Sequence, residues 1–443
     1  MKLNLRGILI CTAAPFIMSC ESVSAPQTPT PAPTVPAPSP TPTPTPTPVA
    51  VSVGAFASTG HEEFDAWRDD FAARALDKGF KVSTIRSLLA DAKPLSTFLD
   101  VQAKTDVVDQ AEFSKPIWKY VGDAVSSSRL STGRQKLQRD ASLFADLEQA
   151  YGVPKEYLAA IWGMETSFGA VIGNFDAPSA LASMAVEGRR RSFAEEELYA
   201  LMRLLERGDA ERDWLIAGWA GAMGQTQFMP STYYAYAVDW TGDGTKDVWR
   251  ARADALASAG NYLQASGWRP GEPAIREVTL PTGFDFGLAD GNKRPVSVWQ
   301  DLGVTPSTAS TLAPASIQSA ELWLPAGSTG PAFLLFPNFQ VIKTYNRADS
   351  YALAVAIMAE NFGGVQVPSK SWPSDIDRLN IAEIKLLQNA LNRLGYSAGP
   401  VDGIAGRGTR TALQDFQKDR NMMADGFPTR RALAAVQAEA GKK

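Results

Sequence analysis

The sequence predicts a mostly α-helical α+β fold, and three observations support this prediction. Apolar residues recur at helical spacing along most of the chain after residue 59. Between Trp268 and about Val341, glycine and proline become frequent and the apolar runs shorten, as in Phe333–Phe336, which predicts a small β-containing subdomain. Beyond a short linker at 367–374, a separate small unit spans 375–440.

The first helices follow directly after residue 59. Thr59 and Glu62 have the spacing of a helix capping box, and Phe64, Trp67 and Phe71 continue at helical spacing. Breaks in the helical pattern are expected at Pro94, Pro116 and Pro154. Further helices are predicted over 194–207, 252–266 and 351–361.

Small residue counts exclude several enzyme classes. The chain of 443 residues has 43 basic and 47 acidic side chains and one histidine, His61. Both cysteines, Cys11 and Cys20, lie near the N-terminus, so the body of the protein has no internal disulfide, cysteine nucleophile or cysteine-based zinc site. A Ser-His-Asp triad would need His61, which lies beside a Pro/Thr-rich stretch. An enzyme of this composition has to move protons with carboxylates, Tyr or Lys, and the net charge of −4 gives no sign of a nucleic-acid partner.

The N-terminal residues are typical of an exported, anchored protein. Residues 1–19 have a positively charged start and an apolar run too short for an ordinary transmembrane helix, as in a signal peptide. The run ends in a segment that resembles a bacterial lipoprotein box and predicts lipidation of Cys20, the alternative being ordinary cleavage after Ser19. Eleven prolines from Pro26 to Pro48 predict an extended tether over 20–55. We therefore expect a periplasmic protein of the cell envelope with a lipid anchor, the outer membrane being favoured.

The helix predicted from Pro154 to Phe168 carries the first candidate for catalysis. Leu158, Ile161 and Glu165 recur on one stripe, which places Glu165 on the face towards the core. With Gly169 as the C′ residue, Glu165 lies in the last turn, near the negative end of the helix dipole. Burial and the dipole would both raise the pKa of this carboxyl, as a general acid requires. The alternative is a helix-end glutamate that faces solvent.

The segment Gly218–Pro230 is a second candidate. Its glycines and small residues allow close backbone approach, and Gln227 offers both a hydrogen-bond donor and an acceptor. This composition is typical of a groove wall, or of a tightly packed helix–loop junction.

A third segment is similar to the start of an EF-hand-type calcium loop. Oxygen-bearing side chains stand at positions 1, 3 and 5, with Gly244 at position 6. Position 12 is Arg250 instead of the usual bidentate glutamate, so a residue of the following helix would have to replace it. The candidate ligands are Asp239, Thr241, Asp243, Asp247 and Asp254. The alternative is an aspartate-rich turn without a metal ion.

Together these segments resemble the lytic murein transglycosylase B family over roughly residues 60–365. The matching segments are Glu112–Trp118, Tyr151–Pro154, Ile161–Gly169, Gly188–Arg191, Ala220–Pro230, Asp239–Trp249, Pro337–Phe339 and Tyr345–Asn346. The resemblance implies a lysozyme-like catalytic domain over 56–366. It also implies cleavage of the MurNAc–GlcNAc β-1,4 bond of peptidoglycan without hydrolysis, which leaves 1,6-anhydroMurNAc ends.

The same resemblance implies roles for single residues. Glu165 matches the family's single catalytic carboxylate, which acts as general acid and then as general base, and this chemistry requires no cofactor. A structural Ca²⁺ in the aspartate loop is also implied. The expected substrate-binding residues are Gln227, Asn338, Tyr345 and Asn346. Gly218 stands where we expect a serine, so water or another side chain has to orient Glu165.

Residues 375–440 resemble the three-helix peptidoglycan-binding domain. The matching segments are Leu387–Gln388, Leu394–Tyr396, Val401–Gly403, Phe416–Gln417 and Asp425–Gly426. The resemblance implies wall binding without identifying the contact residues. The expected partners are peptidoglycan glycan strands, a membrane through the lipid anchor, and other cell-wall enzymes.

Two alternative functions remain open from the sequence. One is a hydrolytic muramidase on the same fold, with a second acid such as Asp176 activating water. The other is a non-catalytic lipoprotein that tethers the membrane to the wall.

Overall fold

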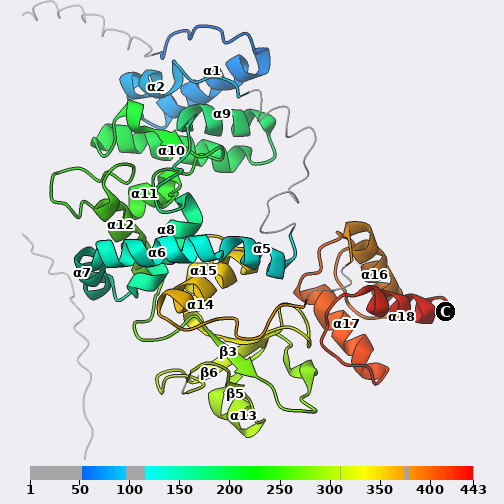
Figure 1. The fold of residues 1–443 in the computed structure, drawn as a ribbon. Helices are drawn as coiled ribbons and strands as arrows, with labels where there is room; N and C mark the ends of the chain where they lie inside the picture. The colour runs from blue at the N-terminus through cyan, green and yellow to red at the C-terminus, as the bar shows by residue number, and fades with distance from the viewer. Residues whose placement is uncertain (1–51, 96–114, 310, 374–378, 443) are drawn as a thin grey trace, which may run out of the picture. The chain divides into compact units, whose positions relative to one another are not determined.

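The structure is a computed structural model that describes residues 52–95, 115–309, 311–373 and 379–442 (Figure 1). The predicted signal peptide, the lipidation site Cys20, the tether as far as residue 51 and Glu112–Ser114 lie outside the described residues. Within the described ranges, no helix is both long enough and apolar enough to cross a bilayer.

Helices dominate the larger part of the protein, as predicted. Those before the sheet are α1 (Glu62–Asp77), α2 (Val82–Leu89), α5 (Ile117–Ala124), α6 (Ser127–Arg139), α7 (Ala141–Tyr151), α8 (Lys155–Thr166), α9 (Ala177–Glu187), α10 (Arg191–Arg207), α11 (Pro230–Tyr236) and α12 (Arg252–Ala265). Those within and after the sheet are α13 (Val296–Asp301), α14 (Pro337–Ile342) and α15 (Asp349–Phe362). A two-stranded pair, β1 (Phe175–Asp176) with β2 (Ile216–Ala217), joins the two chain segments that flank α9 and α10.

The helices form two hydrophobic cores. One lies among α1, α2, α9, α10 and α11 and contains Phe64, Phe71 and Leu198. The other lies among α7, α8, α12, α14 and α15, where α15 is buried along almost its whole length. Helix α8 belongs to the second core, so its C-terminal end is held from several sides.

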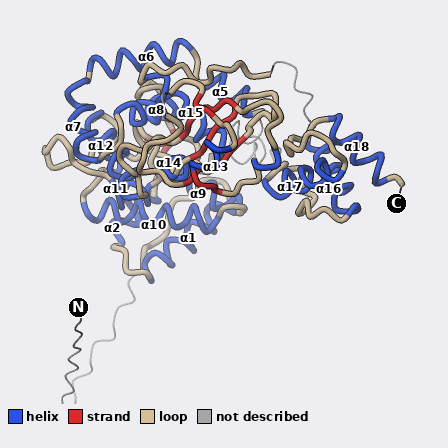
Figure 2. Tube along the Cα trace, turned by 90° about the horizontal axis from the view of Figure 1, so that it is seen from below, coloured by secondary structure: helices blue, strands red, loops and turns tan. Residues whose placement is uncertain are grey.

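The predicted β-containing subdomain is a five-stranded antiparallel sheet in the order β4-β6-β7-β3-β5. The strands are β3 (Ile275–Thr279), β4 (Lys293–Pro295), β5 (Thr305–Pro306), β6 (Ser319–Trp323) and β7 (Ala332–Leu335). Side chains of β7 alternate between two cores, since Phe333 and Leu335 join the helical core while Ala332 and Leu334 pack with Trp299 of α13. Both faces of the sheet are therefore covered, and Figure 2 shows the strands gathered in one region among helices.

The C-terminal residues form a small helical unit of α16 (Ile381–Leu394), α17 (Arg407–Asp419) and α18 (Arg430–Ala440). Its core contains Leu387, Leu391, Leu413 and Phe416. Gln388 is buried and ties the turn at 402–404 to α16, because its amide donates to the Ile404 carbonyl at 3.1 Å and accepts from the Gly403 amide at 2.9 Å. The expected three-helix architecture is confirmed.

The predicted cap of the first helix is wrong. Helix α1 begins at Glu62 with His61 as its N-cap, and the His61 Nδ1 atom accepts from the Phe64 amide at 3.2 Å. Thr59 instead donates to the carboxylate of Asp65 from both its backbone amide and its hydroxyl. The lone histidine is thus engaged in helix capping.

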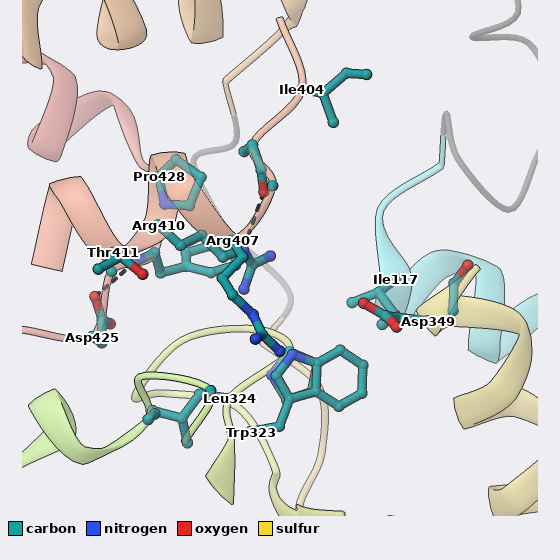
Figure 3. A pocket seen from close by; sticks show the side chains of 18 of the residues that line it. Ile117, Trp323, Leu324, Asp349, Ile404, Arg407, Arg410, Thr411, Asp425 and Pro428 are labelled. Carbon is teal, nitrogen blue, oxygen red and sulfur yellow. Dashed lines mark hydrogen bonds between the residues drawn. The ribbon is translucent and has the colours of Figure 1, made fainter. Parts of the chain in front are cut away.

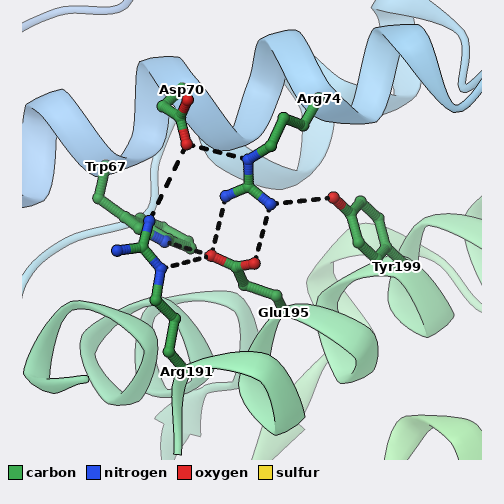
Figure 4. Close-up of polar contacts among 6 residues, drawn as sticks. All are labelled: Trp67, Asp70, Arg74, Arg191, Glu195 and Tyr199. Atoms are coloured by element: carbon green, nitrogen blue, oxygen red, sulfur yellow. Dashed lines mark hydrogen bonds and ion pairs between the residues drawn. The ribbon is translucent and has the colours of Figure 1, made fainter.

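The carboxylate of Glu195 lies at the centre of the polar contacts that join helix α1 to α10 (Figure 4). Glu195 accepts two hydrogen bonds from the Arg74 guanidinium at 2.8 Å, one from the Trp67 indole at 2.9 Å and one from Arg191 at 3.0 Å. Burial would raise the pKa of Glu195, but the bonds from Arg74, Trp67 and Arg191 outweigh it and lower the pKa to about 2. This carboxylate is therefore locked in its charged form.

Candidate active site

Glu165 lies in the last turn of α8, as predicted. Leu158 and Ile161, which share its stripe, are fully buried, whereas Glu165 itself is partly exposed. Helix α8 packs against α15 and α6, so the carboxylate projects from a rigid element.

The end of α8 differs from the prediction. The helix stops at Thr166, and Ser167, Phe168 and Gly169 follow with φ of 50°, 63° and 80°. The left-handed turn therefore begins two residues before Gly169. Phe168 folds back edge-on against Trp162 at 5.6 Å, and a Cβ at Gly163 would lie 2.7 Å from the Phe168 ring. Consecutive left-handed non-glycine residues are costly, and here they begin two residues after the candidate acid.

Tyr351 is the nearest partner of the candidate acid and was missed from the sequence. It lies on α15, is 4 % exposed, and its hydroxyl donates a hydrogen bond to Glu165 Oε1. Burial, and then the charge of Glu165, raises the pKa of Tyr351 well above its ordinary value of 10. Tyr351 therefore stays protonated and donates a hydrogen bond to the Glu165 carboxylate. This bond orients Glu165, as the hydroxyl of the serine expected at position 218 would have done.

Tyr345 is a second buried phenol at the same carboxylate. It follows α14, and burial followed by the charge of Glu165 raises its pKa well above 10. Its hydroxyl is buried and makes no hydrogen bond of normal geometry within the part of the chain that the structure describes. The sequence-predicted pair of Glu165 and Tyr345 is thus brought together.

The predicted groove segment forms a tight turn beside the end of α8. The Thr166 hydroxyl donates to the Gln225 carbonyl at 2.6 Å, and the Gln225 side chain accepts from the Trp162 indole at 3.2 Å. Gln227 is partly buried, has φ of 50°, and donates to the carbonyls of Gly224 at 2.9 Å and Ile172 at 3.3 Å. The turn therefore fixes the Gln227 side chain, with its carbonyl oxygen directed towards position 218.

Gly218 is packed against the Gln227 side chain. A Cβ added at Gly218 would lie 3.0 Å from Gln227 Oε1, closer than most side chains tolerate. A serine there would displace the Gln227 amide by a few tenths of an ångström. Gly218 and the present position of Gln227 are thus compatible with each other.

The two asparagines predicted to bind substrate have different surroundings. Asn338 is fully buried; its amide donates to the Arg269 and Glu272 carbonyls at 2.9 and 2.6 Å, and its oxygen accepts from the Arg269 amide. These bonds use both amide hydrogens of Asn338, and its contact with substrate stays a prediction. Asn346 is partly buried, and its side chain accepts from the Ala348 amide at 3.0 Å, directly before α15.

The carboxylates of the aspartate loop, residues 239–254, accept hydrogen bonds or form ion pairs within the protein. Asp239 accepts from the Gly242 and Gly244 amides at 2.7 and 2.8 Å, and Asp247 is paired with Arg250 at 2.7 Å. Asp254 is fully buried and accepts three backbone amides, those of Trp240, Thr241 and Asp247. No three His, Cys, Asp or Glu side chains of the described ranges converge as a metal site. Asp247 and Asp254 are buried and bonded and do not fit a calcium ligand set, whereas Asp239 is only partly buried and Thr241 and Asp243 are exposed, and their oxygens have the chemistry that Ca²⁺ prefers.

Asp176, the second acid that a hydrolytic mechanism would need, is also engaged. It is the N-cap of α9, accepting from the Ser179 amide at 3.0 Å, and its other oxygen accepts from Arg212 at 2.6 Å. The capping and ion-pair bonds occupy both oxygens, so Asp176 is poorly suited to activate water.

Comparison with known families matches two parts of the chain. A model described as Transglycosylase SLT domain matches residues 63–360, and a peptidoglycan binding domain model matches residues 380–436. Membrane-bound lytic murein transglycosylase B of Escherichia coli (strain K12) is 32 % identical over 288 residues, which cover 62 % of this chain and 77 % of that protein.

Solved structures show the same relationship. SltB3 from Pseudomonas aeruginosa, in complex with NAG-anhNAM-pentapeptide, superposes with a TM-score of 0.78 at 38 % identity, covering 85 % of this chain and 100 % of that one. The Escherichia coli lytic transglycosylase Slt35, in complex with calcium, superposes with a TM-score of 0.56 at 26 % identity, covering 70 % of this chain and 100 % of that one. The chain therefore belongs to the SLT-domain lytic murein transglycosylases, enzymes that cleave peptidoglycan, and carries a C-terminal peptidoglycan-binding domain.

Proposed function

We propose that Glu165 alone performs the acid and base steps that cleave the MurNAc–GlcNAc β-1,4 bond of peptidoglycan. The observation that carries this proposal is the hydrogen bond from the neutral Tyr351 hydroxyl to Glu165 on a rigid helix end. The engagement of Asp176 in a cap and an ion pair argues against a second carboxylate. Ordinary glycosidases need two such groups.

The reaction proceeds in two proton transfers. Protonated Glu165 donates its proton to the glycosidic oxygen as the bond to C1 of MurNAc breaks. The resulting carboxylate then takes the proton of the C6 hydroxyl of the same MurNAc, and that oxygen bonds to C1. The product is a 1,6-anhydro ring, the proton balance is restored, and no water is consumed. Attack from within the same sugar gains effective concentration without positioning a water molecule.

Tyr345 and Gln227 complete the proposed site. The buried Tyr345 hydroxyl has hydrogen-bonding capacity that a substrate oxygen can satisfy. Gln227 presents its amide on the adjoining wall, held by the Gly224 and Ile172 carbonyls. Asn346 contributes by shaping the entry into α15 through its bond to the Ala348 amide.

A comparison of the protein with its Glu165→Gln variant tests this proposal. Purified sacculi are incubated with the protein and with its Glu165→Gln variant, and released muropeptides are weighed by mass spectrometry. We expect products that lack one water and depend on Glu165. Reducing ends would favour a hydrolytic muramidase, and binding without release would favour a wall tether.

The chain's organisation suggests how the enzyme is held in the envelope. We propose that 56–366 is the catalytic domain, 367–374 a linker and 375–440 the wall-binding domain, preceded by the signal peptide at 1–19 and the tether at 20–55. Lipid at Cys20 would anchor the protein, with the outer membrane favoured and other cell-wall enzymes within reach. The name of the membrane-bound relative supports this proposal. Radiolabelled palmitate incorporated into the protein, and lost in Cys20→Ser, tests it.

We also propose that the aspartate loop binds Ca²⁺ only weakly, through Asp239, Thr241 and Asp243. The calcium complex of Slt35 supports such a site in this family. The Arg250–Asp247 ion pair occupies the position where a bidentate ligand would stand. The ion would add local stability and take no part in the chemistry.

A further inference from the structure

The C-terminal unit and the sheet subdomain enclose a cleft of about 570 Å³ (Figure 3). Its walls come from the start of α5, the end of β6, the start of α15 and the start of α17. Ile117, Trp323 and Ile404 supply apolar surface, and Asp349, Arg407 and Arg410 supply charge. No part of the reaction described above uses these side chains.

The two walls of the cleft are joined by specific hydrogen bonds. Asp425 of the C-terminal unit accepts from the Ser328 amide at 3.1 Å and the Ser328 hydroxyl at 2.9 Å. The Gln414 amide donates to the Phe286 carbonyl at 3.1 Å. Asp425 and Gln414 are themselves part of the lining, so these bonds help to define the cleft.

The charges within the cleft are mixed, which favours a zwitterionic ligand. Arg407 is 72 % exposed and lies 3.7 Å from Glu321, too far for a strong ion pair, so its guanidinium can still bind a carboxylate. Burial lowers the pKa of Arg410, whose guanidinium stacks on Phe427 at 5.6 Å. Glu321 and Asp349 supply negative charge, and Asp349 is paired with Lys343 at 2.6 Å.

The cleft is connected to the candidate acid through α15. Asp349 and Ser350 line the cleft, and the next residue, Tyr351, donates to Glu165. The N-terminal end of α15 therefore contributes residues both to the cleft and to the contact with Glu165.

We propose that the cleft binds the peptide stems of the peptidoglycan strand, with Arg407 contacting a stem carboxylate, Trp323 and Ile404 covering apolar side chains, and the acidic side chains facing the amine of a diamino acid. Such peptides carry several carboxylates and an amine, whereas the sugar backbone between them is uncharged. This inference rests on the proposed function and adds a substrate preference for peptide-bearing strands.

Steady-state kinetics on two substrates test the inference with the full chain. One substrate is a glycan strand that carries its stem peptides, and the other is the same strand stripped of peptides by an amidase. We expect Arg407→Ala to raise KM about tenfold on the peptide-bearing strand, the effect of losing one charge-assisted hydrogen bond. kcat on that strand and both constants on the stripped strand are expected to stay unchanged.

The matched control is Arg431→Ala, since Arg431 is an exposed arginine at the start of another helix of the same unit and lies outside the cleft. It is expected to leave both substrates unaffected. An equal rise in KM on the stripped strand would overturn the inference, because Arg407 would then bind sugar or support the fold. An unchanged KM on both strands would overturn it as well.

A direct titration separates this inference from the proposed function. A stem tetrapeptide containing diaminopimelate is titrated calorimetrically into the protein, and its carboxylate-amidated form is the ligand-side control. We expect amidation and Arg407→Ala each to weaken binding about tenfold, and the two together to weaken it no further. Equal affinity for both peptides would contradict the cleft assignment even if cleavage is normal. Absence of anhydro products with peptide binding intact would contradict only the proposed reaction.

Discussion

Glu165 and Glu195 are both glutamates on long helices, yet their surroundings suit opposite tasks. Glu195 accepts hydrogen bonds from two arginines and a tryptophan, so it remains charged over the whole physiological range. Glu165 lies against two buried tyrosines that are neutral and can donate hydrogen bonds but supply no positive charge. A carboxylate that exchanges protons needs neutral partners, whereas one that joins two helices benefits from charged ones.

The largest expected effect is that of Glu165→Gln. The amide keeps the shape and loses the exchangeable proton, so cleavage of sacculi is expected to fall by about 10³-fold or more. Binding to sacculi and the melting temperature are expected to stay unchanged, as measured by co-sedimentation and calorimetry. Residual cleavage within tenfold of the original rate would show that the comparison assigns the wrong carboxylate.

Tyr351→Phe sharpens the comparison by removing one neutral donor. Because a hydrogen bond to a charged group contributes about 1.5–3 kcal/mol, kcat is expected to fall by about 10- to 100-fold. The lost bond favoured the ionised carboxyl, so the alkaline limb of the pH profile of kcat is expected to move to higher pH. An altered KM with an unchanged profile would mean that Tyr351 only supports the fold. Tyr396→Phe, at an exposed hydroxyl bonded to Asp419 in the C-terminal unit, is the matched control.

Glu195→Gln tests Glu195, the glutamate of the two compared above that stays charged. Its pKa is lowered on folding, so its contribution to the free energy of unfolding is complete above the unfolded value of about 4.3 and is lost as the pH falls towards about 2. After allowance for solvent screening, we expect the variant to lose about 1–2 kcal/mol at pH 7. The free energies of unfolding of the protein and the variant, measured by denaturant titration across this pH range, should become equal at the acid end. A constant difference at every pH would indicate a packing effect instead.

The smallest expected effect is that of calcium on the aspartate loop. Since Asp247 and Asp254 are already bonded within the protein, millimolar Ca²⁺ is expected to raise the free energy of unfolding by about 1 kcal/mol or less. Asp243→Asn is expected to abolish this increase without affecting activity in EDTA. A large stabilisation, or a requirement of Ca²⁺ for cleavage, would contradict the proposed weak site.

Structural features that depend on residues close together in the sequence were predicted well. The stripe through Leu158, Ile161 and Glu165 follows from helical periodicity, and the shortened apolar runs after Trp268 correctly indicated the sheet. In contrast, Tyr351 lies 186 residues from Glu165, and only tertiary packing brings the two together. The left-handed Ser167 was missed because the packing of Phe168 on Trp162, and not the glycine, sets the helix end.

The family resemblance was informative about function but less so about single contacts. It correctly indicated a lytic transglycosylase and a peptidoglycan-binding domain. It also assigned Asn338 to the substrate; this assignment stays a prediction, and the structure adds that the Asn338 amide is fully buried and bonded to the Arg269 and Glu272 backbones. A polar residue in a matching motif can hold the backbone of a groove without reaching into it.

Incorporation of solvent oxygen tests the central claim, cleavage by one carboxylate without water, most directly. Sacculi are digested in H₂¹⁸O, and the new MurNAc ends are analysed by mass spectrometry, with a hydrolytic lysozyme as the parallel control. We predict anhydro ends that contain no ¹⁸O, because the C6 oxygen of the same sugar closes the ring. Reducing ends that carry ¹⁸O at C1 would contradict the account and identify a hydrolase.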